Sequence, residues 1–192
     1  MEKSYKVQEA INKCIEVLSK GGLIIYLTDT VWAIGCDATN EEAVAKIYAL
    51  KKRATTKKMI CLVANDVMLE KHIKRVPELA YDIIDLATKP TTLVYDEPIG
   101  IAKNLISTDN TIAIRVASDK FCQYLISKFK KPLAATSANL DGTDAPRNFQ
   151  EIRPAILKGV DYVVNLPEEK NSGTVSAIIQ LKNDGTVKII RE

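Results

Sequence analysis

Apolar runs of strand length alternate with helical stretches along nearly the whole chain of 192 residues. Short apolar runs bounded by turn residues predict strands, and apolar residues repeated every three or four positions predict helices. The predicted strands cover 23–27, 59–64, 91–96, 111–117, 132–138 and 162–166, with two more runs inside 174–191. The predicted helices cover 7–20, 41–52, 66–74, 77–88, 119–130 and 149–159. This alternation predicts an α/β domain whose sheet is largely covered by helices.

Local turn and capping signals refine this prediction. The Asn-Asp-Gly turn at 183–185 joins the last two apolar runs and predicts a β-hairpin, so the sheet should be mixed rather than purely parallel. Thr39 and Glu42 have the spacing of a capping box in front of the helix at 41–52. The sequence has no internal repeat, low-complexity segment or linker, and we therefore expect one domain over residues 1–192.

Composition and charge exclude several classes of site. The net charge of +3 is mild, so it permits an acidic ligand or an RNA partner without predicting either. The four cysteines are far from one another and from the single histidine, His72, which excludes the usual zinc spacings and a C-x-x-C redox motif. We interpret them as buried, reduced thiols. No apolar run approaches the roughly 20 residues of a membrane span, and the expected location is cytoplasmic, with no membrane contact.

Polar residues that directly follow apolar strand runs are the candidates for a site, because ligands of such sheets bind beyond the strand ends. Four segments have this position: Thr28–Thr30, Arg115, Thr136–Asn139 and Ser176. The small hydroxyl and amide groups of the T-S-A-N segment can hold phosphate oxygens. The same residue types are also ordinary at a strand-to-turn boundary, so both interpretations stay open.

The run KKRATTKK at 51–58 carries five cations in eight positions. It begins at the C-terminal end of a predicted helix, where basic side chains are common because they complement the helix dipole. No Walker A or G-x-G-x-x-G pattern occurs, so a bound nucleotide would depend on separate lysine and arginine side chains. The run is therefore either a solvated charged surface or part of an anion site.

Several segments, in the right order, resemble the motifs of one family. LTDTVWAIGCDA resembles the P-T-[ED]-T-[VF]-[YF]-G-[LI]-G-x-x-[AP] segment that opens the YrdC-like domain of threonylcarbamoyl-AMP synthases, and KKR at 51–53 matches its K-x-R. IAIRVAS resembles its V-x-[VI]-R-[VM]-P, and PLAATSANLDG resembles its P-L-x-x-[TP]-S-A-N-x-S-G. GTVSAIIQL and IIRE resemble the closing segments. The chain is identified as a member of this family over nearly its whole length.

The resemblance implies a reaction and a fold. Family members convert L-threonine, bicarbonate and ATP to threonylcarbamoyl-AMP and pyrophosphate. The product supplies tRNA threonylcarbamoyladenosine at position 37 through a downstream threonylcarbamoyl-transfer complex, and tRNA or double-stranded RNA is a further expected partner. Mg²⁺ should accompany ATP, held by phosphate oxygens and water without protein metal ligands. The implied fold is a single-domain twisted open mixed sheet, in a short form without an extra C-terminal domain, with helices on its faces and a basic concave active-site face.

The resemblance also implies roles for particular residues. The implied catalytic residues are Lys51 and Arg53. The implied ATP-binding residues are Lys51, Arg53, Lys57, Thr111, Ser137, Asn139, Arg147 and Arg191. The implied threonine-binding residues are Thr30, Arg115 and Ser176. We expect Lys52 and Lys58 to face water.

Two departures from the family pattern bear on amino-acid specificity. Leu62 stands where many members carry a histidine near the threonine pocket, and Ala117 replaces the proline of the V-R-x-P motif. One alternative is therefore a YrdC-like paralogue that adenylates another carboxylate or a carbamoyl substrate. The other is a non-catalytic module that binds double-stranded RNA or tRNA with the same basic concave face.

Overall fold

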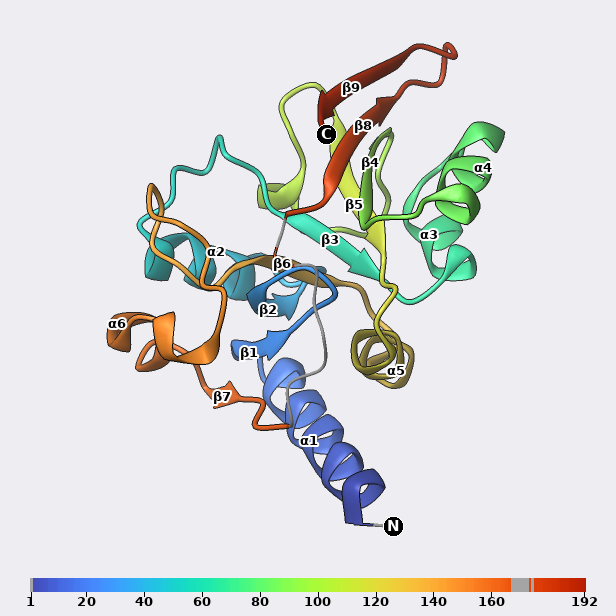
Figure 1. The fold of residues 1–192 in the computed structure, drawn as a ribbon. Helices are drawn as coiled ribbons and strands as arrows, with labels where there is room; N and C mark the ends of the chain where they lie inside the picture. The colour runs from blue at the N-terminus through green and yellow to red at the C-terminus, as the bar shows by residue number, and fades with distance from the viewer. Residues whose placement is uncertain (1, 167–172, 174) are drawn as a thin grey trace.

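Residues 2–166, 173 and 175–192 are described by a computed structural model, in which they form a nine-stranded sheet with helices on both faces (Figure 1). The strand order is β7-β1-β2-β6-β3-β5-β4-β8-β9. The strands are β1 (Ile24–Leu27), β2 (Trp32–Asp37), β3 (Ile60–Val63), β4 (Thr91–Asp96), β5 (Thr111–Val116), β6 (Leu133–Ser137), β7 (Tyr162–Val163), β8 (Ala177–Leu181) and β9 (Val187–Arg191). The helices are α1 (Glu2–Ser19), α2 (Glu41–Lys51), α3 (Asp66–His72), α4 (Glu78–Leu86), α5 (Lys120–Phe129) and α6 (Pro154–Leu157), with 3₁₀ turns η1 (Lys103–Leu105) and η2 (Phe149–Glu151).

The sheet is mixed, as predicted. Within the described residues, β1/β7, β3/β5 and β4/β8 pair in parallel, and the other neighbours pair antiparallel. The predicted terminal hairpin is confirmed as β8–β9, with Gly185 at a φ of +89° in its turn. The order places β2 beside β6 and β4 beside β8, so segments far apart in the chain become neighbours. The α/β fold class is confirmed.

The sequence did not predict β2, which forms a hairpin with β1. The connecting turn is closed by Thr28, whose amide and hydroxyl both donate to the carbonyl oxygen of Val31, at 3.3 and 2.8 Å. No Asn-Gly or similar dipeptide marks this turn, because a threonine side chain closes it instead.

The start of α2 differs from the predicted capping box. Asn40 is the N-cap, and its Oδ1 accepts hydrogen bonds from the amides of Glu42 and Ala43, at 3.0 and 3.1 Å. Thr39 donates its hydroxyl to Asp37 at 2.6 Å instead. Asparagine is as good an N-cap as threonine, and here it lies one residue closer to the helix.

Two apolar clusters cover the two faces of the sheet. On one face, α1 and α5 pack over the strands through side chains that include Ile11, Cys14, Tyr26, Leu62, Cys122 and Leu133. On the other face, α2, α3 and α4 contribute to a cluster that includes Ile34, Val44, Cys61, Leu69, Ala80 and Ile114. All four cysteines are buried and none forms a disulfide, in agreement with their interpretation as structural thiols.

The face under α1 and α5 also holds the cavity that is described below. Ala33 and Ala135 belong to the cluster beneath these helices, yet both also line that cavity. Figure 1 shows α1 and α5 at one end of the molecule and the β8–β9 hairpin at the other. The cavity therefore occupies the part of this face that the two helices leave uncovered. Among the described helices, none has the length and apolar character to cross a membrane.

Candidate active site

A cavity of about 250 Å³ opens on this uncovered part of the sheet. Its wall is formed by Thr28, Thr30, Val31, Ala33, Arg53, Lys58, Met59, Ile60, Ala113, Arg115, Ala135, Thr136, Ser137, Val175, Ser176, Ile178 and Arg191. Six of the residues predicted for the site meet in this one cavity, namely Thr30, Arg53, Arg115, Ser137, Ser176 and Arg191.

The β1–β2 turn supplies a buried polar corner. Thr28 Oγ1 donates to the carbonyl oxygen of Val31 and lies 2.9 Å from Thr30 Oγ1. A hydroxyl has one proton, so Thr30 must be the donor in the contact between the two threonines. Thr30 Oγ1 is then left with lone pairs that face Arg115, whose Nη1 and Nη2 are each 3.5 Å away.

Arg115 places a buried positive charge in the cavity wall. Its side chain is 4% exposed, and its Nη2 lies 3.0 Å from Asp29 Oδ1 in an ion pair. Its Nε has no hydrogen-bond partner among the described residues. A guanidinium that lines a cavity is suited to a carboxylate or phosphate oxygen.

Ser176 and Arg191 form a further part of the cavity wall. The buried hydroxyl of Ser176 lies 2.7 Å from Thr92 Oγ1, and its carbonyl oxygen accepts from Arg191 Nε and Nη2, at 2.9 and 2.7 Å. Burial and the neighbouring charge of Arg115 lower the pKa of Arg191. The guanidinium groups of Arg115 and Arg191 thus line one cavity together with Arg53, and an anion between them would relieve their repulsion.

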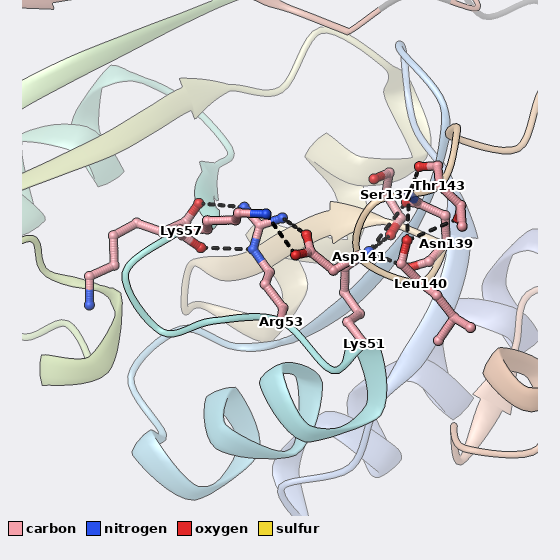
Figure 2. A network of polar contacts seen from close by, with 9 residues as sticks. Lys51, Arg53, Lys57, Ser137, Asn139, Leu140, Asp141 and Thr143 are labelled. Atoms are coloured by element: carbon pink, nitrogen blue, oxygen red, sulfur yellow. Dashed lines mark hydrogen bonds and ion pairs between the residues drawn. The ribbon is translucent and has the colours of Figure 1, made fainter.

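Lys51 supports the cavity from outside its wall. This side chain, 1% exposed, ends α2, and its ammonium donates to the carbonyl oxygens of Ser137 and Asn139 (Figure 2). Burial, followed by the nearby charge of Arg53, lowers the pKa of Lys51 to about 8. Lys51 does not line the cavity and holds the end of β6 through these two carbonyl oxygens, and its predicted roles in catalysis and ATP binding stay predictions.

Arg53 and Lys57 are connected by Asp141, as Figure 2 shows. Asp141 accepts from Lys57 Nζ at 2.8 Å, and its other oxygen lies 3.5 Å from Arg53 Nη1. The hydrogen bond from Lys57 and the charges around it lower the pKa of Asp141. Arg53 Nε and Nη2 donate to the carbonyl oxygens of Lys57 and Lys58, at 2.7 and 3.0 Å. Arg53 therefore reaches the cavity while it braces its own loop, whereas Lys57, 58% exposed, turns to Asp141.

The two remaining lysines of the run behave differently from each other. Lys52 is exposed as predicted, and with a φ of +52° it ends α2 in the left-handed conformation. The prediction that Lys58 faces water is wrong. Lys58 is half-buried, donates to the carbonyl oxygen of Asn104 at 3.1 Å and contributes to the cavity wall. The loop closes back on β3 because Arg53 holds its carbonyl groups, and this turns Lys58 inward.

A second hollow, of about 420 Å³, adjoins the turn that follows β6. It is lined by Ala138, Asn139, Gly142, Thr143, Asp144, Ala145, Pro146, Glu151 and Arg153. The side-chain amide of Asn139 donates to the carbonyl oxygens of Leu140 and Thr143 and so holds this turn. Ser137 and Asn139 therefore serve different hollows.

The structure does not bring Thr111 or Arg147 to either hollow among the described residues. Thr111 lies at the end of β5 remote from Arg115, and its hydroxyl donates to Asp109 at 2.8 Å. Arg147 is exposed in the loop before η2. Their predicted contacts with ATP stay predictions.

The two departures from the family pattern lie on the same face of the sheet as the cavity, under the helices beside it. Leu62 is opposite Arg115 in the β3/β5 register but is fully buried under α1 and α5. Ala117 is buried in the same cluster. Neither side chain lines the cavity.

Sequence reasoning left several residues that shape the site without a role. Thr136 and Asp29 lie within the candidate segments named above, but the sequence did not show that Thr136 would line the cavity or that Asp29 would pair with Arg115. Asp141 lies within the PLAATSANLDG segment, but its ion pairs could not be predicted, because its cationic partners are more than 80 residues away in the sequence.

Comparison with known proteins places this architecture in a family. The family model for Sua5, YciO and YrdC proteins, described as "Telomere recombination", matches residues 16–192. The chain belongs to the Sua5/YciO/YrdC family. The threonylcarbamoyl-AMP synthase of Hahella chejuensis is 34% identical over 184 residues, which cover 95% of this chain and 97% of the relative. The enzyme of the same name from Pseudoalteromonas translucida is 31% identical over 163 residues, 83% of this chain and 87% of the relative.

Solved structures of the Sua5/YciO/YrdC family share the fold. A variant of P. abyssi Sua5 has a TM-score of 0.86 and 25% identity, and covers 94% of this chain. P. abyssi Sua5 complexed with L-threonine has a TM-score of 0.81 and 25% identity, and covers 89% of this chain. The chain spans only about half of these two proteins, 55% and 50%. E. coli YciO, at 23% identity and a TM-score of 0.82, covers 96% of this chain, which spans 89% of YciO, and supports the fold alone.

Proposed function

We propose that this member of the Sua5/YciO/YrdC family is a threonylcarbamoyl-AMP synthase, which converts L-threonine, bicarbonate and ATP to threonylcarbamoyl-AMP and pyrophosphate. The observation that carries the proposal is the single cavity in which Arg115 and Ser176 lie beside Arg53, Ser137 and Arg191. The first two residues would bind a carboxylate and the other three would bind phosphates. A cavity that binds both groups is suited to a reaction that joins an amino acid to a nucleotide. The names of the curated relatives and the L-threonine complex of P. abyssi Sua5 support the same reaction.

The amino acid would occupy the corner formed by the β1–β2 turn and β5. Arg115 would bind the carboxylate, because its guanidinium places a positive charge in the wall of the cavity. Thr30 and Ser176 line the same cavity with buried hydroxyl groups, and the half-buried Thr136 adds a third hydroxyl group. Leu62 is buried under α1 and α5 and does not line the cavity, and the proposed substrate is threonine rather than a different carboxylate.

The nucleotide phosphates would lie toward Ser137, Arg53 and Arg191. Asn139 lines the adjoining hollow and is proposed to contact the nucleotide there. Lys57 is exposed and can exchange Asp141 for a phosphate oxygen. Thr111 and Arg147 are retained as proposed ATP contacts without geometric support.

The chemistry asks for charge neutralisation rather than proton transfer. The threonine amine and bicarbonate give an N-carboxylate with loss of water. Its oxygen then attacks the α-phosphorus as the bond to pyrophosphate breaks. The nucleophile is already an anion, so this step needs no general base, and Arg53 and Arg191 would stabilise the charge that develops on the phosphate oxygens. Lys51 would contribute by holding the Ser137 carbonyl and the strand end in place.

Magnesium would be held by the triphosphate and water. Within the described part of the chain, no group of three or more His, Cys, Asp or Glu side chains could hold a metal ion. The carboxylate of Asp141 is engaged by Lys57 and Arg53. The residues present therefore fit a Mg²⁺ ion that arrives with ATP, as is usual for this ion.

The proposed product would serve tRNA threonylcarbamoyladenosine at position 37. That role implies that the protein is a nucleotidyltransferase and that one domain covers residues 1–192. It also implies a location in the cytoplasm and a downstream threonylcarbamoyl-transfer complex as partner. A basic concave face above the cavity, with tRNA or double-stranded RNA as a ligand, is part of the same proposal.

The test is pyrophosphate release by the purified protein with ATP, L-threonine and bicarbonate, with mass spectrometry to detect threonylcarbamoyl-AMP. We expect release only when all three substrates are present. Release without L-threonine would indicate a different acceptor and would contradict the proposal. Failure to bind ATP, with salt-dependent binding of RNA, would favour the non-catalytic module.

A further inference from the structure

Asp29 is the counter-ion of the buried Arg115. A guanidinium that is 4% exposed needs a negative charge close by, and Asp29, itself 9% exposed, provides it at 3.0 Å. Asp29 Oδ1 accepts no hydrogen bond among the described residues, so this contact is an ion pair without hydrogen-bond alignment. Asp29 therefore stabilises the positive charge of the guanidinium and fixes its position through Nη2.

Asp29 is held in turn by Ser118. The hydroxyl of Ser118 donates to Asp29 Oδ2 at 2.5 Å. Ser118 lies two residues after β5, the strand that carries Arg115, whereas Asp29 lies in the β1–β2 turn. Three strands separate β1 from β5 in the sheet. The contacts of Asp29 with Arg115 and with Ser118 therefore connect the β1–β2 turn to the end of a strand that is not its neighbour.

Asp119 is the other acidic residue near Arg115, and it caps the N-terminus of α5. Its Oδ1 accepts from the amide of Cys122 at 2.7 Å as the N-cap of α5. Burial raises the pKa of Asp119, which disfavours its charged form. Asp29 is therefore the carboxylate on which the orientation of Arg115 depends.

We propose that Asp29 is a positioning residue that, together with Ser118, holds the Arg115 guanidinium in the orientation in which it lines the cavity and meets the carboxylate of the amino-acid ligand. Asp29 does not line the cavity, so it acts through Arg115 rather than on the ligand. The inference rests on the proposed function, in which Arg115 binds this carboxylate.

The test compares the affinity for L-threonine with that for L-threoninamide, which keeps the amine and side chain but lacks the carboxylate charge. Isothermal titration of the full chain should give a preference for L-threonine of about tenfold or more, as expected for a charge-assisted contact. In Asp29→Asn, which removes the charge and keeps the shape, the preference should fall below about threefold. Asp119→Asn should keep both the helix cap and the preference, because asparagine is an equally good N-cap.

Two results would overturn the inference alone: an unchanged preference in Asp29→Asn, or an equal loss of affinity for both probes. If the unmodified protein binds neither probe, the proposed function fails and this inference fails with it. Ser118→Ala changes an exposed side chain and provides a second variant if Asp29→Asn does not fold. It should reduce the preference by about two- to fivefold through loss of one charge-assisted hydrogen bond, and no reduction would overturn the proposal.

Discussion

At the scale of single residues, Lys51 shows how the site holds a buried charge without a carboxylate. The oxygens nearest its ammonium belong to the backbone of Ser137 and Asn139 and to the side chain of Asn139. These dipoles offset only part of the loss of hydration, and burial lowers the pKa of Lys51 to about 8. Lys51 remains charged at neutral pH, and burial of this charge lowers the free energy of unfolding there.

This opposition makes stability depend on pH. The folded protein releases the Lys51 proton near pH 8, whereas the unfolded chain keeps it up to about pH 10.5, so the free energy of unfolding should rise with pH between these values. From pH 7.5 to 9.5, the unmodified protein should gain about 1–2 kcal/mol relative to Lys51→Met in urea unfolding. Lys52→Met, at the exposed neighbour, should follow the unmodified protein. A flat difference between the Lys51 variant and the unmodified protein would contradict this assignment.

Asp141 competes with any anion for Arg53 and Lys57. Asp141→Asn removes that negative charge, so KM for ATP should fall by about two- to fivefold, and more at low ionic strength. Stability should change little, because Lys57 is largely exposed. Asp82→Asn, an exposed position in α4 with the same change in net charge, should leave KM unchanged. A higher KM for Asp141→Asn would mean that Asp141 orients the two cations instead.

At the scale of elements, the β1–β2 hairpin depends on a glycine. A Cβ at Gly35 of β2 would lie 2.7 Å from Tyr26 Cε1 and 3.0 Å from its hydroxyl oxygen. The Tyr26 ring is fully buried under α1 and α5, so it cannot move aside. The close approach of ring and backbone positions the turn that carries Thr28 and Thr30.

Gly35→Ala should therefore destabilise the protein by about 1–3 kcal/mol in urea unfolding, the usual effect of overpacking. The double variant with Tyr26→Leu tests the cause, because leucine leaves space where the ring edge was. In that background Gly35→Ala should cost less than about 1 kcal/mol. An equal cost in both backgrounds would show that the ring is not the obstacle.

At the scale of the whole molecule, the cavity draws on strands from both halves of the chain. Arg191 comes from the last strand and docks on Ser176, beside Arg115 of β5. Arg191→Ala should raise KM for ATP by about tenfold, the value of one charge-assisted contact. Lys188→Ala removes an exposed cation from the same strand and should have little effect. Equal effects of the two variants on KM would show that Arg191 acts only through the overall positive charge of the surface.

The sequence predicted most strands and helices because their periodicity is local. It missed β2, whose turn is closed by the Thr28 hydroxyl, and it placed the cap of α2 on Thr39 instead of Asn40. It identified Thr30, Arg53, Arg115, Ser137, Ser176 and Arg191, which meet in one cavity, by motif resemblance and by their positions after strands. It could not predict that Lys58 turns inward, because that depends on how the loop closes on β3.

By itself the sequence determined the fold class, the identity of the cationic and hydroxyl side chains and their order along the chain. Only the tertiary structure decided which of them meet. In the tertiary structure Lys51 donates to the carbonyl oxygen of Asn139, Lys57 pairs with Asp141, and Asp29 pairs with Arg115. These contacts join positions more than 80 residues apart. The order and pairing of the strands bring them together, and no local pattern of residues records that arrangement.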